Sequence, residues 1–389
     1  MGKRKIAFLL IVALFITSGL FRMITPLAGT TDREEDGPII IGHIAALSGD
    51  AAVRGQSEKQ ALEIMVDDIN AGGGVLGRPL QLICYDNTGD QSGTFAAANR
   101  LAADKAVAIV GPSHSGLCIT AAQVLETAGI VMISTTSANQ QLTVPADHTE
   151  PPKYIFSTDF TDAEQAAKAA AFAIDYLGVG KAGILKDSSS DYSLNLAACF
   201  EKAFAQKGGV IVADESFQAG KAEFTGQLSR IKESGAGLLF VPTIQGEGKL
   251  IIRQAKEMEL DCRFLGGDAW AGGRLTGPDN EILEGSFLIN ISPTMDSVMT
   301  DWVERYIKNT GEKPVMPNAA LAGDALCLIV EGIKATKSTD SGRLADWLAN
   351  CRDVQVLTGI MTMNPDTHSP LNRQAVIETV ANGQFTSLF

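Results

Sequence analysis

The sequence is poor in the residues and patterns that most catalytic and metal sites need. It has only 4 histidines in 389 residues, and their positions do not match the spacing of a metal site. The 6 cysteines stand singly, without a C-x-x-C pair, which argues against zinc and redox motifs. We therefore expect no metal, no cofactor and mostly buried free thiols, with room for one disulfide among Cys84, Cys118, Cys199, Cys262, Cys327 and Cys351.

Positive charge is also scarce, since the chain carries a formal net charge of −13. Residues 1–31 hold four cations and no anions, so the remainder carries −17. Nucleic acids and anionic lipid surfaces need cationic partners. We expect neither to bind this chain.

A long apolar segment is absent outside the N-terminus. There Lys3, Arg4 and Lys5 precede a 16-residue apolar run that ends at Phe21, shorter than the roughly 20 residues of a membrane span. This order is typical of an export signal, although the small-x-small cleavage pattern at Pro26-Leu27-Ala28 is weak. We expect residues 1–31 to be a signal peptide or, failing that, an uncleaved anchor, with the rest of the chain periplasmic.

The apolar pattern predicts an α/β fold in two similar sets. The first set has expected strands at 39–44, 80–85, 107–110 and 130–133, with helices at 57–70, 93–103 and 115–127. After a proline-containing break the second set has strands at 154–157, 182–185, 210–213, 238–241 and 264–265, with helices at 162–177, 192–206, 224–233 and 249–258. Helices at 299–309, 318–334 and 344–351 and strands at 359–363 and 374–380 follow. Alternating strands and helices favour parallel sheets covered on both faces, with ligands bound where strands end.

A glycine-rich segment at residues 72–77 matches G-x-G-x-x-G, but its context is wrong for a nucleotide site. That motif needs a strand before it and a helix after it. Here a predicted helix precedes it and a predicted strand follows. We interpret the segment as a helix end and a turn.

Residues Gly111 to Ser115 lie between a predicted strand and a predicted helix. A hydrolase would need G-x-S-x-G here, and Ser115 stands where the last glycine belongs. Hydroxyl and N–H groups at a helix start suit a carboxylate. The alternative interpretation is that Ser113 or Ser115 is a plain N-cap. In the second set, Asp268 follows a predicted strand, where it can either meet an ammonium group in the cleft or lie solvated in a turn.

The chain resembles the branched-chain amino acid (leucine/isoleucine/valine) binding family of type I periplasmic solute-binding proteins. The resemblance runs from residue 39 to the C-terminus and depends on the order of several stretches, among them AIVGPSHSG, GIVMISTTSANQQLT and RQAKEMELDCRFLGGDAW. It implies two doubly wound Rossmann-like lobes joined by three hinge crossovers, near residues 157–159, 290–292 and 356–359. Lobe 1 would comprise 38–157 and 291–355, and lobe 2 would comprise 158–290 and 356–389.

The resemblance also implies roles for individual residues. Ser115 would hold the ligand α-carboxylate, with help from the backbone at Thr136. Asp268 would hold the ammonium group, and Tyr192 would close over the ligand. Where the family has a threonine that binds both polar groups, this chain has Ala138.

Other positions depart from the family and put an aliphatic ligand in doubt. Arg54 stands at an aromatic pocket position, where it can neutralise an acidic or polar side chain or be an exposed loop arginine. Two further aromatic positions fall at Ile244 and Gly323, which implies a roomier or more polar pocket. The family's disulfide positions align with Gly89 and His114, so that bond is absent.

The expected function is therefore binding without catalysis. The resemblance implies a monomeric solute-binding protein of an ABC importer that captures an amino acid, branched-chain-like or more polar, and delivers it to an inner-membrane permease. The alternative is a sensor or binding protein of the same fold for an amide, urea or aromatic acid. An enzyme is disfavoured because the sequence contains no recognisable base–nucleophile pair or metal cluster.

Overall fold

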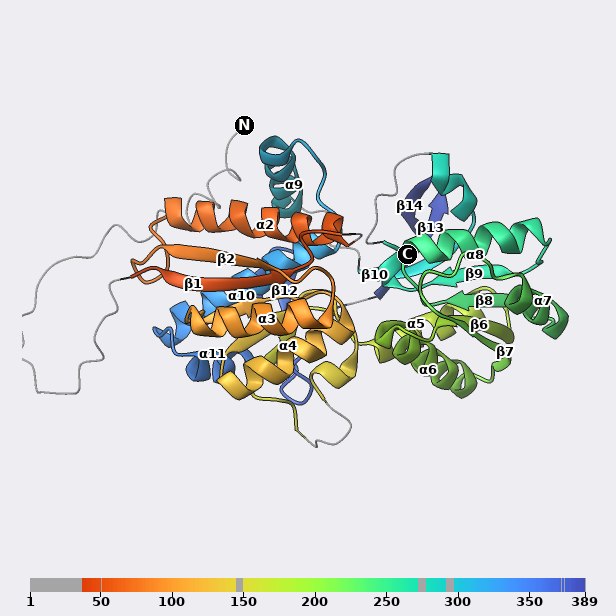
Figure 1. The fold of residues 1–389 in the computed structure, drawn as a ribbon, viewed down its shortest axis with the longest axis horizontal. Coiled ribbons are helices and arrows are strands. Elements are labelled where there is room, and N and C mark those ends of the chain that lie inside the picture. Colours follow the sequence, from red (N-terminus) through yellow and green to blue (C-terminus); the bar gives the residue numbers. More distant parts are fainter. Residues whose placement is uncertain are drawn as a thin grey trace, which may run out of the picture.

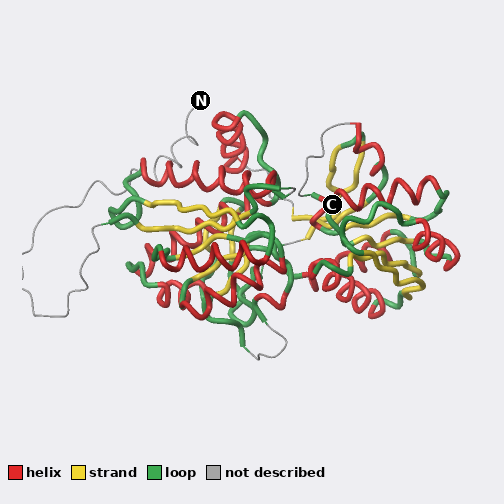
Figure 2. Tube along the Cα trace, viewed as in Figure 1, coloured by secondary structure: helices red, strands yellow, loops and turns green. Residues whose placement is uncertain are grey.

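The structure is a computed structural model that describes residues 37–49, 51–144, 150–271, 278–291, 297–371, 373 and 375–388. It has two α/β lobes side by side, each built on its own sheet (Figures 1 and 2). The expected signal segment, 1–31, lies outside the described residues. Within the described ranges, no helix combines the length and the apolar character that crossing a membrane requires.

The first lobe has a five-stranded parallel sheet in the order β2-β1-β3-β4-β5. Its strands are β1 (Ile39–Ala45), β2 (Leu80–Asp86), β3 (Ala108–Val110), β4 (Val131–Ser134) and β5 (Ile155–Ser157). Helices α2 (Ala52–Ala71), α10 (Asn318–Thr336) and α11 (Ser341–Leu348) share one core with the sheet, and α3 (Gln91–Ala103) and α4 (Ser115–Ala128) share another. Helix α9 (Ser297–Thr310) packs against α2. The sheet is thus covered on both faces.

The second lobe has a seven-stranded sheet in the order β14-β13-β10-β9-β8-β6-β7, in which β13 and β14 are antiparallel. Its strands are β6 (Lys181–Asp187), β7 (Val210–Phe217), β8 (Leu238–Val241), β9 (Arg263–Gly266), β10 (Phe287–Ile291), β13 (Ala375–Ala381) and β14 (Gln384–Ser387). Helices α5 (Asp162–Ala171) and α6 (Asp191–Gln206) cover one face, and α7 (Thr225–Ser234) and α8 (Gln245–Glu257) cover the other. A π-helical turn, Phe172–Tyr176, extends α5.

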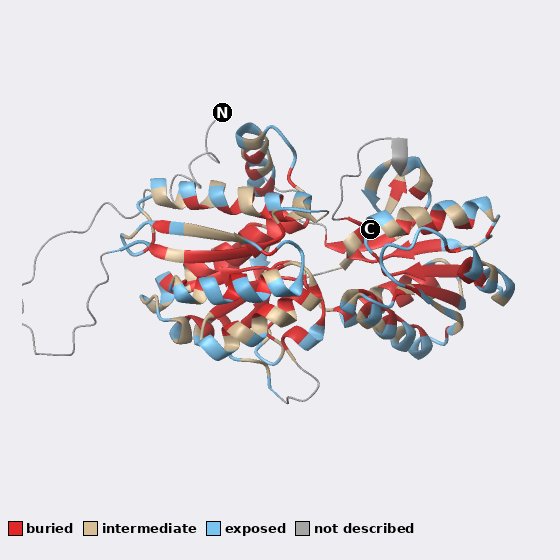
Figure 3. Cartoon of the chain, in the orientation of Figure 1, coloured by how far each residue is buried: buried red, intermediate tan, exposed pale blue. Residues whose placement is uncertain are grey.

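Burial explains why the strands contain continuous apolar runs. Strands β3, β4 and β8 are buried at every residue, as expected for parallel strands covered on two faces. Figure 3 shows buried strands between helices whose outer sides are exposed. Fully burying a side chain such as Ile41 or Leu239 contributes about 1.5–3 kcal/mol. These cores fix the strand ends, where the loops of the candidate site begin.

The predicted strands and helices occur in the expected order, but the strand at 154–157, assigned to the second set, pairs with β4 in the first sheet. The apolar pattern does not predict strands β10, β11 (Val354–Val356) and β14. The third crossing also differs from the expectation. Strands β11 and β12 (Gly359–Met361) form a hairpin whose buried residues belong to the first lobe's core. The chain joins the second sheet only at β13. The apolar residues of the hairpin fill space beside α10, so 356–361 belong with the first lobe rather than the second.

Two smaller predictions can also be compared with the structure. The six cysteines are free, as expected, but only Cys118 and Cys351 are buried and the other four are half-buried. Residues 72–77 end α2 and form the turn before β2, with Gly73, Gly74 and Gly77 at positive φ. That geometry is a helix end, not a phosphate cradle.

Candidate functional site

The two lobes meet where their parallel strands end. Arg54 Nη2, from α2 of the first lobe, donates a 3.0 Å hydrogen bond to the backbone oxygen of Ala269 in the second lobe. Near the first crossing, the backbone N–H of Asp162 donates to the oxygen of Ala138 over 2.7 Å. Helices α4 and α6 also approach each other, with Asp191 against Gly116. Loops from both lobes therefore face one interlobe site.

The first lobe contributes the start of helix α4. Gly111 follows β3 with φ 85°, and a Cβ there would lie 2.5 Å from the oxygen of Ile44, so this turn requires glycine. His114 is the N-cap residue but makes no side-chain capping bond. The first N–H groups of a helix lack partners within the helix, and they carry partial positive charge. Ser115, buried at the first helical position, therefore lies beside a group of donors suited to an anion.

The loop after β4 lies against the same helix start. Ser137 Oγ donates to Ser115 Oγ over 3.3 Å, and Thr136 Oγ1 donates to the oxygen of Ser113 over 3.1 Å. Ala138 is buried, and its oxygen is engaged by Asp162. Ser137, which neighbours the missing threonine position, thus reaches Ser115 directly. The loop keeps a hydroxyl at this point although residue 138 has none.

The second lobe contributes a buried carboxylate. Asp268 follows β9, and its Oδ1 accepts hydrogen bonds from Gln165 Nε2 at 2.9 Å and from Tyr192 Oη at 2.8 Å. A Cβ on Gly267 would lie 2.2 Å from Tyr192 Oη. Glycine at 267 therefore lets the tyrosine hydroxyl reach the carboxylate. This geometry replaces the alternative of a solvated turn residue for Asp268.

Two further carboxyl groups, those of Asp159 and Asp162, lie near Asp268. Burial raises its pKa, whereas the bonds from Gln165 and Tyr192 and the charge of Arg54 act in the opposite direction. Burial and the charge of Asp268 raise the pKa of Asp159 well above its usual value. Burial raises the pKa of Asp162 to about 7, with a smaller contribution from Asp268. A cation bound among these carboxyl groups would stabilise their ionised forms.

Arg54 and Glu58 lie one turn apart on α2. Helix α2 starts at Ala52, so Arg54 belongs to its first turn and not to a loop. Glu58 is fully buried, and its Oε1 accepts hydrogen bonds from Thr135 Oγ1 at 3.2 Å and Asn318 Nδ2 at 3.1 Å. Burial raises the pKa of Glu58 to about 7. Sequence reasoning missed Glu58, although its i, i+4 spacing from Arg54 places both residues on one helix face.

The six residues expected at the site come from both sides of the lobe junction: Arg54, Ser115, Thr136 and Ala138 on the first lobe, Tyr192 and Asp268 on the second. Gly323 does not supply the extra pocket space expected of it. A Cβ there would lie 2.8 Å from Leu357 and 2.9 Å from Met65, so neighbouring side chains fill that space. Ile244 is exposed at the start of α8.

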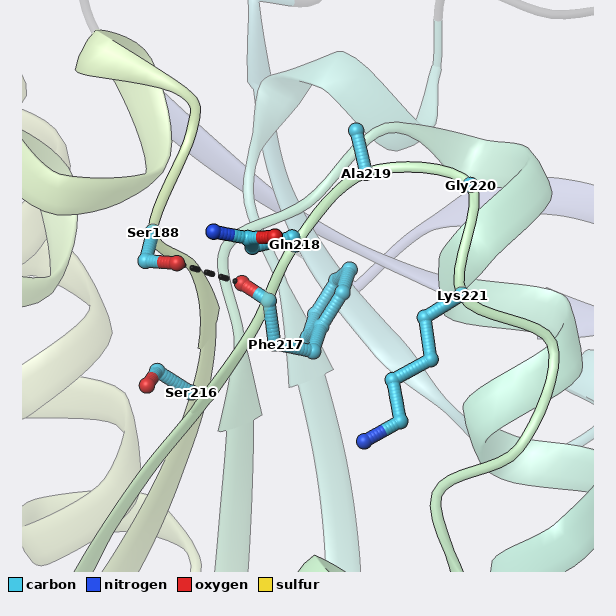
Figure 4. A pocket seen from close by; sticks show the side chains of 7 residues that line it. All are labelled: Ser188, Ser216, Phe217, Gln218, Ala219, Gly220 and Lys221. Carbon is cyan, nitrogen blue, oxygen red and sulfur yellow. Dashed lines mark hydrogen bonds between the residues drawn. The ribbon is translucent and has the colours of Figure 1, made fainter.

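A separate open pocket of about 480 Å³ lies at the ends of β6 and β7. Figure 4 shows the hydroxyl of Ser188 donating to the oxygen of Phe217, with Lys221 further along the loop that follows Phe217. None of the six predicted site residues lines it. The interlobe region, where those residues gather, is the better candidate.

The chemistry of the interlobe residues favours binding. Burial lowers the pKa of His114 to about 4, so this imidazole is neutral at neutral pH. Within the described ranges, His, Cys, Asp and Glu side chains form no group that could hold a metal ion. The donors at the start of α4 suit an anion, and the carboxyl groups around Asp268 suit a cation. The arrangement matches a zwitterion.

The chain is similar to several solute-binding proteins. The Leu/Ile/Val-binding protein BraC3 of Rhizobium johnstonii is 26% identical over 327 residues, which are 83% of this chain and 87% of that protein. The branched-chain amino acid substrate-binding protein LivJ of Streptococcus pneumoniae, solved with isoleucine, is 27% identical with a TM-score of 0.78, covering 90% of this chain and 98% of that one. The leucine-binding protein LivK of Thermotoga maritima is 24% identical with a TM-score of 0.80 and the same coverage.

The family assignment covers nearly all of the described chain. Residues 38–384 match the family described as periplasmic binding protein. The fold of the chain is that of the type I periplasmic binding proteins among its solved relatives. The chain therefore belongs to the periplasmic binding protein family.

Proposed function

We propose that this protein captures an amino acid between its lobes and presents it to the inner-membrane permease of an ABC importer. The observation that carries this proposal is the pairing of donors at the start of α4 with the buried Asp268 carboxylate across the lobe junction. Each charged group of a ligand loses water on binding and must find a partner. The relatives' names, which specify leucine, isoleucine and valine, support an amino acid ligand.

Within this proposal, Ser115 and the first N–H groups of α4 bind the α-carboxylate, with Thr136 contributing its backbone. Asp268 binds the ammonium group, and Tyr192 covers the ligand while it orients Asp268. Ser137, hydrogen-bonded to Ser115, takes the part of the hydroxyl absent at Ala138. An amide, a urea or an aromatic acid carries no ammonium group to neutralise Asp268, so these alternative ligands fit less well.

The proposal extends to organisation and location. Residues 38–157 and 297–363 form the first lobe, and residues 158–291 and 375–388 form the second. The protein is a periplasmic monomer, exported by residues 1–31, and catalyses no reaction. Closure of the two lobes over the ligand is the state that the permease recognises.

A thermal-shift screen tests the proposed function. Ligand bound to the folded form raises the melting temperature by mass action. We expect a shift with one or more L-amino acids and none with the matching methyl ester, which lacks the carboxylate charge. A shift with benzoate or urea, and none with any amino acid, would contradict the proposal.

A further inference from the structure

Arg54 is held in a position that links the lobes. Its side chain starts on the first turn of α2, is partly buried and reaches the backbone oxygen of Ala269 over 3.0 Å. Ala269 directly follows Asp268. The first lobe therefore contacts the segment that carries the candidate ammonium-binding carboxylate.

That segment is also fixed from within the second lobe. Gln165 Oε1 accepts from the backbone N–H of Asp268 over 3.1 Å, and Tyr192 Oη accepts from that of Ala269 over 3.4 Å. The carbonyl that Arg54 engages is thus part of a rigid turn. Because Arg54 binds a backbone oxygen of the protein, this contact does not depend on the side chain of the ligand.

The charges near Arg54 favour this role over binding an acidic ligand side chain. Burial lowers the pKa of Arg54, and the nearby carboxyl groups of Asp268 and Glu58 act in the opposite direction. Asp159 and Asp162 add further carboxyl groups around Asp268. A ligand carboxylate placed here would approach this acidic cluster, and like charges repel at short range.

The lobes also touch at a second place. A Cβ on Gly116 would lie 2.6 Å from Asp191 Oδ2, so α4 and α6 meet through a glycine and a carboxylate. The Arg54 contact and the Gly116 contact join different elements, so the two lobes touch at two separate places.

We propose that Arg54 is a latch between the lobes, which sets how long the closed form persists and acts equally on every ligand. This inference rests on the proposed function, because its first test measures the binding rates of amino acids. Arg54 is a positioning residue in this scheme: it holds the lobes together and leaves recognition of the ligand to other groups.

The test measures association and dissociation rates for an apolar, a polar and an acidic amino acid that bind the wild type. Arg54→Met keeps the length of the side chain and removes its charge, whereas Arg54→Lys keeps the charge. Arg253→Met, at an exposed arginine of α8, is the matched control. We expect Arg54→Met to raise the dissociation rate tenfold or more by the same factor for all ligands, with a nearly unchanged association rate. Arg54→Lys should recover part of the loss, and Arg253→Met should have no effect.

A faster dissociation for only one class of ligand side chain would overturn the latch and assign Arg54 to side-chain recognition. Unchanged dissociation rates for all ligands would also overturn it. If the wild type binds no amino acid, the proposed function fails, and small-angle scattering then tests the latch by itself. The latch predicts a larger radius of gyration for Arg54→Met than for wild type and Arg253→Met. Equal radii would overturn it.

Discussion

Glu58 illustrates how a buried residue behind the site can control it. The carboxylate bonds to Thr135 after β4 and to Asn318 at the start of α10. Asn318 in turn donates to Thr136 Oγ1 over 3.3 Å. The Glu58 side chain therefore connects helix α2 and the start of α10 to the loop proposed to bind the ligand carboxylate.

Glu58 also predicts a dependence of stability on pH. Burial raises its pKa from 4.5 to about 7, so the folded protein retains this proton to higher pH than the unfolded chain. The resulting stabilisation is complete below the unfolded pKa and is lost as pH rises through about 7. Between pH 5 and pH 8 the free energy of unfolding should fall in wild type by about 2–3 kcal/mol more than it falls in Glu58→Gln. Urea denaturation at both pH values measures this difference.

Glu63→Gln is the control, because Glu63 is an exposed residue of the same helix. It should leave the difference between pH 5 and pH 8 as in wild type. Equal pH dependence in wild type and Glu58→Gln would show that Glu58 carries no such proton.

Single residues were predictable where position along the chain was informative. Ser115 and Asp268 each follow a strand that the apolar pattern identifies, and strand ends face ligands in α/β folds. Gln165 and Glu58 lie within helices, where exposure to a site depends on packing between distant elements. Pattern alone places Glu58 on a helix face but does not say that Asn318, 260 residues away, binds it.

At the scale of elements, helix starts show why some boundaries were predictable. Helix α5 begins with a capping box in which Thr161 and Glu164 bond each other's backbone, a signal legible in the sequence. Helix α2 begins at Ala52 after Ala51, which makes no side-chain cap bond. The apolar pattern therefore predicts this helix only from residue 57, five residues after its actual start, and leaves Arg54 outside it.

The approach of α4 to α6 predicts the effect of a wedge between them. Gly116→Val adds a branched side chain where even a Cβ would lie 2.6 Å from Asp191. Asp191 can rotate away from a single methyl group but not readily from a valine, so we expect the lobes to close less completely and ligand affinity to fall at least tenfold. Calorimetric titration with an amino acid that binds wild type measures the loss.

Gly246→Val is the matched control. Gly246 is also the second residue of its helix, α8, and a Cβ there meets nothing within 4 Å. Its affinity should equal that of wild type. Wild-type affinity in Gly116→Val would mean that α4 and α6 do not need to approach for binding.

At the scale of the whole molecule, a buried ion pair joins the crossings. Arg373 Nη2 lies 2.6 Å from Asp324 Oδ2, with side-chain exposures of 10% and 0%. Arg373 also donates to the oxygen of Thr158 in the first crossing and to Thr358 Oγ1. The apolar pattern of the sequence does not predict these contacts, because Arg373, Asp324 and Thr158 lie on segments far apart in the chain.

Removing one partner of this pair leaves a buried charge uncompensated. Asp324→Ala should lower the free energy of unfolding by about 3–5 kcal/mol. Glu331→Ala, which removes an exposed pair with Lys334 on the same helix, should cost less than about 1 kcal/mol. Chemical denaturation measures the free energy of unfolding of both variants. Equal losses would mean that the Arg373–Asp324 pair stabilises the protein no more than an exposed pair does.

The central claim is that Asp268 binds the ammonium group of an amino acid held between the lobes. Titration calorimetry tests it with wild type and Asp268→Ala, each against the best-binding amino acid and its analogue without the amino group. We predict that the substitution weakens binding of the amino acid by about 3 kcal/mol or more and leaves binding of the analogue unchanged or stronger. Equal weakening for both ligands, or none for the amino acid, would contradict the claim.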